Sequence, residues 1–135
     1  ELAARATGKL TPVQLDQLDA LNTQYEQAQQ AQDKAGMDHA GHQFHRTINR
    51  AANSPRLATL MGSLAKQMSN RFYTNIEGQT DDVLDYHPMI VKALRLQDAE
   101  SVRTLMFQHI LNGGKHLLAM LERQRQAGDS EPSAL

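Results

Sequence analysis

The chain has 135 residues, of which 40% are hydrophobic and 21% are charged, and its formal net charge is −1. This composition is typical of one globular domain with a core. The apolar runs are only a few residues long, which excludes a transmembrane segment, and no secretion signal opens the sequence, so we expect a cytoplasmic protein.

The residue types that are scarce exclude several kinds of chemistry. The chain has no cysteine, so disulfides, thiolate catalysis and sulfur-ligated zinc are excluded, and histidine and carboxylates remain as metal donors. A near-neutral charge without a basic face, with three Phe, three Tyr and no Trp, indicates that this chain does not itself bind nucleic acid.

The first half of the sequence predicts three helices. Residues 1–7 have helical composition without a preceding capping residue, so we expect a helix that starts upstream and ends at Gly8. Thr11 and Pro12 are typical of a helix start, and this second helix has an inward stripe of Leu15, Leu18, Leu21, Tyr25 and Ala28. Asp33 is the expected N-cap of a third helix that ends near Asn53.

A fourth helix is predicted to restart at once from Ser54 and Pro55. Its periodicity predicts a buried stripe of Leu57, Leu60, Met61, Leu64, Met68 and Phe72. Arg71 lies at the edge of this stripe, where an arginine either reaches solvent or enters a cavity to hold an anion. The following residues, from 75 to 82, are expected to form a loop around Gly78.

Two further helices complete the predicted architecture. One runs from about residue 82 to 96 with Pro88 near its start, and the other from Asp98 to about Gln126. The last helix is expected to bury Val102, Leu105, Met106, His109, Ile110, Leu117 and Met120. No strand pattern competes, so we predict an all-α antiparallel bundle of about six helices, with one domain over residues 1–128 and a flexible tail over 129–135.

Three histidines lie on helix faces that are otherwise apolar: His45 beside Phe44 and Ile48, His87 before an apolar run, and His109 within the last stripe. A single inward histidine is more often a hydrogen-bonded core residue than a ligand. Three on separate helices are harder to explain in that way. If these helices share an interior, the imidazoles converge as a site for a divalent ion whose open position accepts water or a small carboxylate.

The other motifs favour binding over catalysis. No His-Glu-x-x-His or Glu-x-x-His pair is present, and no Ser or Lys stands out as an activated nucleophile, so we do not expect an enzyme. Two other interpretations stay open, a helical-bundle metalloenzyme with a three-histidine site and a structural or dimerising module whose histidines are merely buried.

A set of spaced motifs resembles a known family. Phe44-His45 is followed by the segment AANSPRL over residues 51–57, and Met106 and Ile110 flank His109. His87 precedes Ile90, Ala93, Leu94 and Asp98, and it lies 22 residues before His109. This order resembles the FCD effector-binding domain of GntR-family bacterial transcription regulators over nearly the whole chain.

The resemblance implies a bundle of six or seven helices around a central pocket, where many members bind a divalent metal and a small carboxylate metabolite. It also implies a homodimer and an N-terminal winged helix-turn-helix domain that binds operator DNA. That domain is not in these 135 residues, so DNA is expected as a partner only through it. By position, His45, His87 and His109 match the family's three histidine ligands. We expect them, with Arg71, to contact the effector.

One position departs from the family's pattern. Metal-binding members usually have an aspartate, or sometimes an asparagine, four residues before the first histidine, and Gly41 stands there in this chain. Glycine supplies no donor, so water or effector completes the shell, His42 replaces the carboxylate, or the metal binds weakly or not at all. We favour a three-histidine site for zinc or nickel, in an effector-sensing domain that modulates DNA binding.

Overall fold

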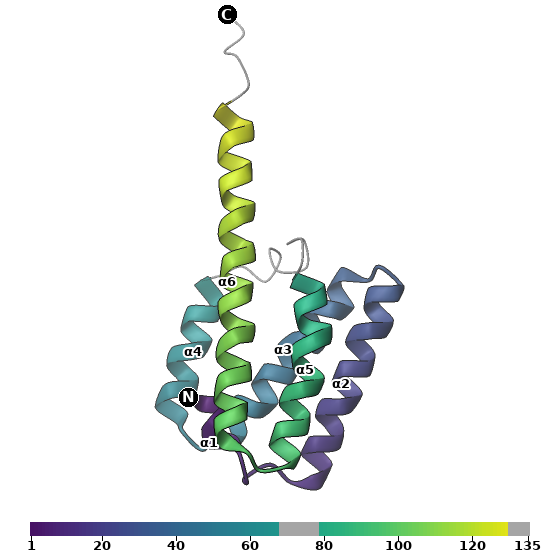
Figure 1. Ribbon diagram of the computed structural model, residues 1–135, viewed down its shortest axis with the longest axis vertical. Helices are drawn as coiled ribbons and strands as arrows, with labels where there is room; N and C mark the ends of the chain where they lie inside the picture. Colours follow the sequence, from purple (N-terminus) through teal and green to yellow (C-terminus); the bar gives the residue numbers. More distant parts are fainter. Residues whose placement is uncertain (68–78, 130–135) are drawn as a thin grey trace, which may run out of the picture.

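The computed structural model describes residues 1–67 and 79–129, and these residues form an all-helical bundle without strands (Figure 1). The helices are α1 (Leu2–Ala6), α2 (Pro12–Gln30), α3 (Lys34–Ala51), α4 (Pro55–Gln67), α5 (Gln79–Arg95) and α6 (Ala99–Asp129). α6 extends well beyond the other helices at its C-terminal end (Figure 1). None of the helices described is both long enough and apolar enough to cross a bilayer. The predicted fold class is therefore confirmed.

The predicted signals at Thr11, Asp33 and Asn53 for the ends of α2 and α3 are confirmed. The Thr11 hydroxyl accepts a hydrogen bond from the Gln14 amide at 3.2 Å, and the Gln14 side chain accepts one from the Thr11 amide at 2.9 Å, which forms a complete capping box. The Asp33 carboxylate accepts a bond from the Gly36 amide at 3.0 Å at the start of α3. Asn53 follows α3 with a φ of 51°, the left-handed conformation that asparagine tolerates.

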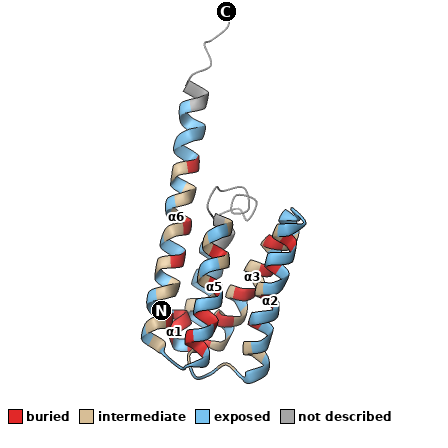
Figure 2. Cartoon of the chain, turned by 45° about the vertical axis from the view of Figure 1, so that its right-hand side comes forward, coloured by how far each residue is buried: buried red, intermediate tan, exposed pale blue. Residues whose placement is uncertain are grey.

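The core lies where α1, α2, α3, α5 and the first half of α6 meet, and the buried residues of these helices face one another (Figure 2). The largest fully buried side chains include Phe44 and Ile48 of α3, Leu18 of α2, and Ile90 of α5. Full burial of such a side chain stabilises the fold by about 1.5–3 kcal/mol. A smaller cluster joins α2, α3 and the start of α5 through Tyr25, Ala28, Met37, Ala40 and Val83.

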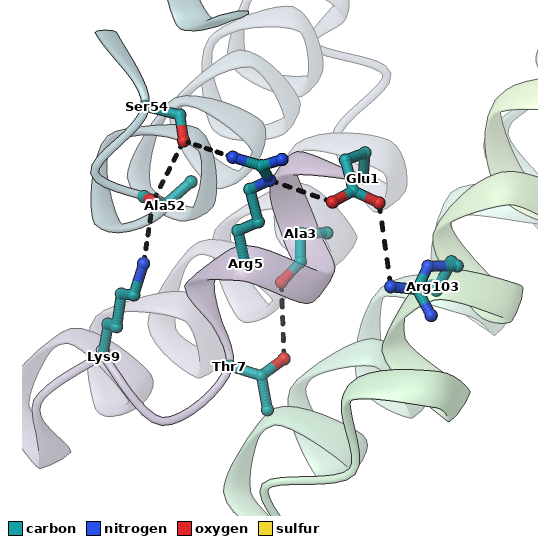
Figure 3. Close-up of polar contacts among 8 residues, drawn as sticks. All are labelled: Glu1, Ala3, Arg5, Thr7, Lys9, Ala52, Ser54 and Arg103. Carbon is teal, nitrogen blue, oxygen red and sulfur yellow. Dashed lines mark hydrogen bonds and ion pairs between the residues drawn. The ribbon is translucent and has the colours of Figure 1, made fainter.

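The short helix α1 is fixed to the bundle by apolar packing and by polar contacts at its ends (Figure 3). The ammonium group of Lys9 donates to the Ala52 carbonyl at 3.0 Å. Glu1 pairs with Arg5 at 2.9 Å and lies 3.7 Å from Arg103 on α6. Exposed ion pairs contribute little to stability, so the buried residues of α1 account for most of its docking.

The predicted inward face of α4 is wrong in the described part of the helix. Leu60, Met61 and Leu64 are 56%, 41% and 47% exposed, and only Leu57 is partly buried against the core. Among the helices described, α4 packs chiefly against α3, and the exposure of these three side chains shows that no described helix covers the stripe. Met68, Arg71 and Phe72 lie outside the described residues.

Two predicted helix boundaries and the predicted burial of one side chain also differ from the structure. α5 begins at Gln79, so Pro88 lies in the helix interior rather than near its start, and the described part of the predicted loop, 79–82, is helical. α6 continues to Asp129, the first residue of the expected tail. Ile110 is 53% exposed, because it lies on the side of α6 that no described helix covers. The domain boundary at residue 128 stays a prediction.

Candidate metal centre

The structure brings together the three histidines singled out in the sequence. His45 of α3, His87 of α5 and His109 of α6 meet in the interior, and one ring nitrogen from each lies within 4.8 Å of the other two. His109 Nε2 is 3.3 Å from His87 Nε2 and 3.3 Å from His45 Nε2. His87 and His109 are 1% and 2% exposed, whereas His45 is partly buried. The three imidazoles therefore point at one common position.

Aromatic packing sets the orientation of these rings. The Phe44 ring stacks on His87 with centroids 3.8 Å apart and an angle of 7° between the planes. His45 stacks on His109 at 5.3 Å, and Tyr86 lies 5.9 Å from His109. Phe44 is fully buried and directly precedes His45, so one turn of α3 places a ligand candidate and also the ring that positions His87.

Burial keeps all three imidazoles neutral. It lowers the pKa of His45 to about 3, with smaller contributions from His109 and His42. Burial also lowers the pKa of His87 far below its usual range, helped by His45 and His109. The pKa of His109 is lowered by burial as well, although the carboxylate of Asp82 opposes that shift. Neutral imidazole is the form that binds a metal, so a cation would displace no proton here near neutral pH.

The hydrogen-bonding capacity of the centre fits a cation. A neutral imidazole nitrogen holds either one hydrogen or one lone pair, so His109 Nε2 can form a good hydrogen bond with only one of its two neighbours at 3.3 Å. Two nitrogen ligands of one tetrahedral zinc, each at about 2.0–2.1 Å, lie about 3.3–3.4 Å apart, which matches both separations. An ion that all three nitrogens face would replace the unfavourable contact with coordination bonds.

A polar group borders the centre along α6. Asp82 of α5 pairs with His116 at 2.9 Å and accepts a hydrogen bond from Asn112 at 3.4 Å. Asn112 and His116 lie one and two turns after His109 on the same side of α6. Sequence reasoning missed Asp82, because it was assigned to the end of a loop. Only the pairing of α5 with α6 brings it close to the histidines.

The remaining candidate residues have different surroundings. His42 is exposed and does not join the three converging nitrogens, although it is a minor cause of the lowered pKa of His45. A Cβ atom at Gly41 would lie 3.6 and 3.8 Å from the Tyr25 ring, an ordinary contact distance. Position 41 therefore has room for a side chain but supplies no donor. Arg71, the predicted anion contact, lies outside the described residues.

A surface hollow of about 370 Å³ lies between α2 and α5, and its lining does not include the three histidines. It is formed by Asp19, Asn22, Thr23, Tyr25, Glu26, Val83, Leu84 and Pro88. Tyr25 lines this hollow, and the centroid of its ring lies 6.4 Å from that of the His87 ring. This hollow therefore does not test the prediction of an effector pocket beside the imidazoles.

Fold and site together define an all-helical domain with an interior cluster of three neutral histidines. Comparison with protein families identifies that class more closely, because the model of the FCD domain matches residues 1–112. The chain belongs to the FCD domain family. The matched range spans α1 to the first half of α6 and includes all three histidines. The comparison with curated proteins found no match.

Proposed function

We propose that this chain is the effector-sensing domain of a GntR-family transcription regulator. In this proposal His45, His87 and His109 hold a divalent metal, with zinc or nickel as the expected ion, and a small carboxylate metabolite binds at the remaining coordination position. The convergence of three neutral imidazole nitrogens from three helices is the main supporting observation. Membership of the FCD domain family supports the regulatory role.

The residues around the site have separable roles in this mechanism. The ion supplies positive charge that attracts a carboxylate. Phe44 keeps the His87 ring in place by stacking at 3.8 Å, and the neighbouring apolar residues exclude water from the imidazoles. Since Gly41 contributes no carboxylate, the centre keeps more of the ion's charge for an anionic effector. Arg71 stays a candidate second anion contact.

A ligand bound at this site would contact three helices that are far apart in the sequence. α3, α5 and α6 each contribute one histidine, so a ligand that binds one arrangement of these helices better than another shifts their populations. In a dimeric regulator this shift re-spaces the two DNA-binding domains and changes operator affinity. DNA contact belongs to the winged helix-turn-helix domain and not to this chain.

The alternative of a helical-bundle metalloenzyme requires a general base beside the ion. The carboxylate that acts on His109 is Asp82, and both of its oxygens are already engaged, one by His116 and one by Asn112. This arrangement favours binding over turnover, in agreement with the absence of catalytic motifs.

Metal-stripped protein tests the proposal directly. Adding zinc or nickel should raise the melting temperature, and free ion at a hundred times its dissociation constant stabilises the fold by about 2.7 kcal/mol. His87→Ala should abolish the rise, while His39→Ala, at an exposed histidine of α3, should keep it. With metal bound, calorimetry against acetate, lactate and citrate should detect binding of at least one acid. No metal-dependent stabilisation, or metal binding without any carboxylate binding, would count against the sensing role.

A further inference from the structure

The outward face of α6 is apolar over most of its length. Phe107, Leu111, Leu118 and Leu121 are 64%, 39%, 62% and 45% exposed. Gly114 occupies the remaining position of the series, and a Cβ atom built there would meet nothing within 4 Å. The five positions, called the α6 stripe below, are spaced alternately by four and three residues. That spacing is the repeat of helices that pair lengthwise with another helix.

The α6 stripe lies on the side of the helix opposite to His109. At 100° per residue its members are centred about 160° away from the histidine, so the described helices cover one side of α6 and leave the other open. The stripe continues into the part of α6 that projects beyond the other helices (Figure 1). A continuous apolar surface of this kind is rare on monomers and marks an interaction site.

The spacing along the stripe fits a second copy of the same helix running in the opposite direction. A two-fold axis between Asn112 and Gly113 sets Phe107 opposite the partner's Leu118, and Leu111 opposite the partner's Gly114. Leu111 of each copy then fills the gap left by Gly114 of the other copy, so the two-fold pair contains two such contacts. In a parallel pair each gap would face the other gap, and both would stay unfilled.

The residues that flank the stripe are compatible with this register. Ile110 comes opposite the partner's Leu117, which extends the apolar contact on one side. Gln108 comes opposite the partner's Lys115 on the other side, so no like charges face each other. An antiparallel register displaced by one heptad would instead set the two copies of Lys115 against each other.

A homodimer is already implied by the family resemblance; we infer that the α6 stripe is the surface through which the two copies associate, with their α6 helices antiparallel about an axis between Asn112 and Gly113. The paired segment from Thr104 to Leu121 is about 26 Å long at 1.5 Å per residue. The inference goes beyond metal and effector binding and does not depend on the histidine centre. The histidine centre and the α6 stripe are related only by position, because His109 and the stripe lie on opposite sides of the same helix.

Oligomeric state in solution provides the first test. By sedimentation, the 135-residue chain should have twice its monomer mass of 15.1 kDa at tens of micromolar. Leu118→Glu places a charge against the partner's Phe107 twice per dimer and should weaken association more than about a hundredfold. Leu96→Glu is the matched control, since Leu96 is 70% exposed and lies outside the stripe, and it should leave the dimer intact. Circular dichroism verifies that each variant stays folded.

Mixing two variants tests the direction of pairing. Phe107→Lys alone should also be monomeric, because each substituted position faces an apolar residue of the other copy. An equimolar mixture of Phe107→Lys and Leu118→Glu should form dimers again, since in an antiparallel pair the two substituted positions face each other with opposite charge. A monomeric wild-type chain, or a dimer unaffected by Leu118→Glu, would overturn the proposed surface. A mixture that stays monomeric would overturn the antiparallel register.

Discussion

Acidification of the metal-free protein should destabilise the bundle through its interior histidines. Burial, with His109 and His42 as smaller causes, lowers the pKa of His45 to about 3, while an unfolded chain has a histidine pKa of about 6.5. Between these values the unfolded chain binds a proton that the folded chain does not. The stabilising contribution is therefore complete above about pH 6.5 and is lost progressively as the pH falls toward 3.

The size of the effect follows from the same two pKa values. Each pH unit in this window costs about 1.4 kcal/mol per proton, so His45 alone removes about 2 kcal/mol by about pH 5. The pKa values of His87 and His109 are lowered as well, and their losses add in the same direction. Since a domain of this kind is stable by about 5–15 kcal/mol in total, the loss should be easy to measure.

Urea unfolding in the presence of a chelator, followed by circular dichroism at several pH values from about 7 to 5, measures this dependence. His45→Gln removes one titrating group, so the free energy of unfolding that is lost between those pH values should be smaller by about 2 kcal/mol. His39→Gln, at an exposed position of the same helix, should keep the wild-type dependence. If His45→Gln loses stability with acid as steeply as the wild type, the assignment of the effect to the buried histidines is wrong.

Two further substitutions test the centre and its supports. Gly41→Asp restores the carboxylate found at this position in the metal-binding domains that the sequence resembles, and the Tyr25 ring leaves room for its Cβ at 3.6 Å, so zinc affinity measured by competition with a chelator should rise. An unchanged or weaker affinity would indicate that position 41 does not reach the ion. Phe44→Ala removes a fully buried ring and its stacking on His87, and it should cost about 3–5 kcal/mol in urea unfolding and weaken metal binding as well. Weaker zinc binding at unchanged stability would contradict the packing role.

The sequence predicted those features that depend on neighbouring residues or on one helix face. The capping box at Thr11 and Gln14 and the cap at Asp33 involve residues three positions apart, so their chemistry is visible in the chain itself. The three histidines were found for a related reason. A polar ring on an apolar face indicates an interior partner, and three such faces indicate a common one.

Features that depend on which helix packs beside which could not be predicted in this way. The periodicity of α4 placed Leu60, Met61 and Leu64 on one face, but it could not show that no described helix covers that face. Ile110 was predicted to lie inward as part of the stripe that includes Leu105 and Met106, but the periodicity could not show that no described helix covers its side of α6. The pair of Asp82 and His116 joins positions 34 residues apart and has no signature in either segment.

The packing that stabilises this bundle is also what makes its centre competent to bind a metal. Phe44 belongs to the main core cluster and stacks on His87, so the same burial that favours folding removes the imidazoles from water and keeps them neutral. Without a cation, His109 Nε2 faces two nitrogens and can satisfy only one, and among the described residues its Nδ1 has no hydrogen-bond partner. The apo fold therefore includes a local cost that binding a cation removes. A ligand that stabilises the ion in turn acts on the packing of three helices, which is the coupling that a sensor requires.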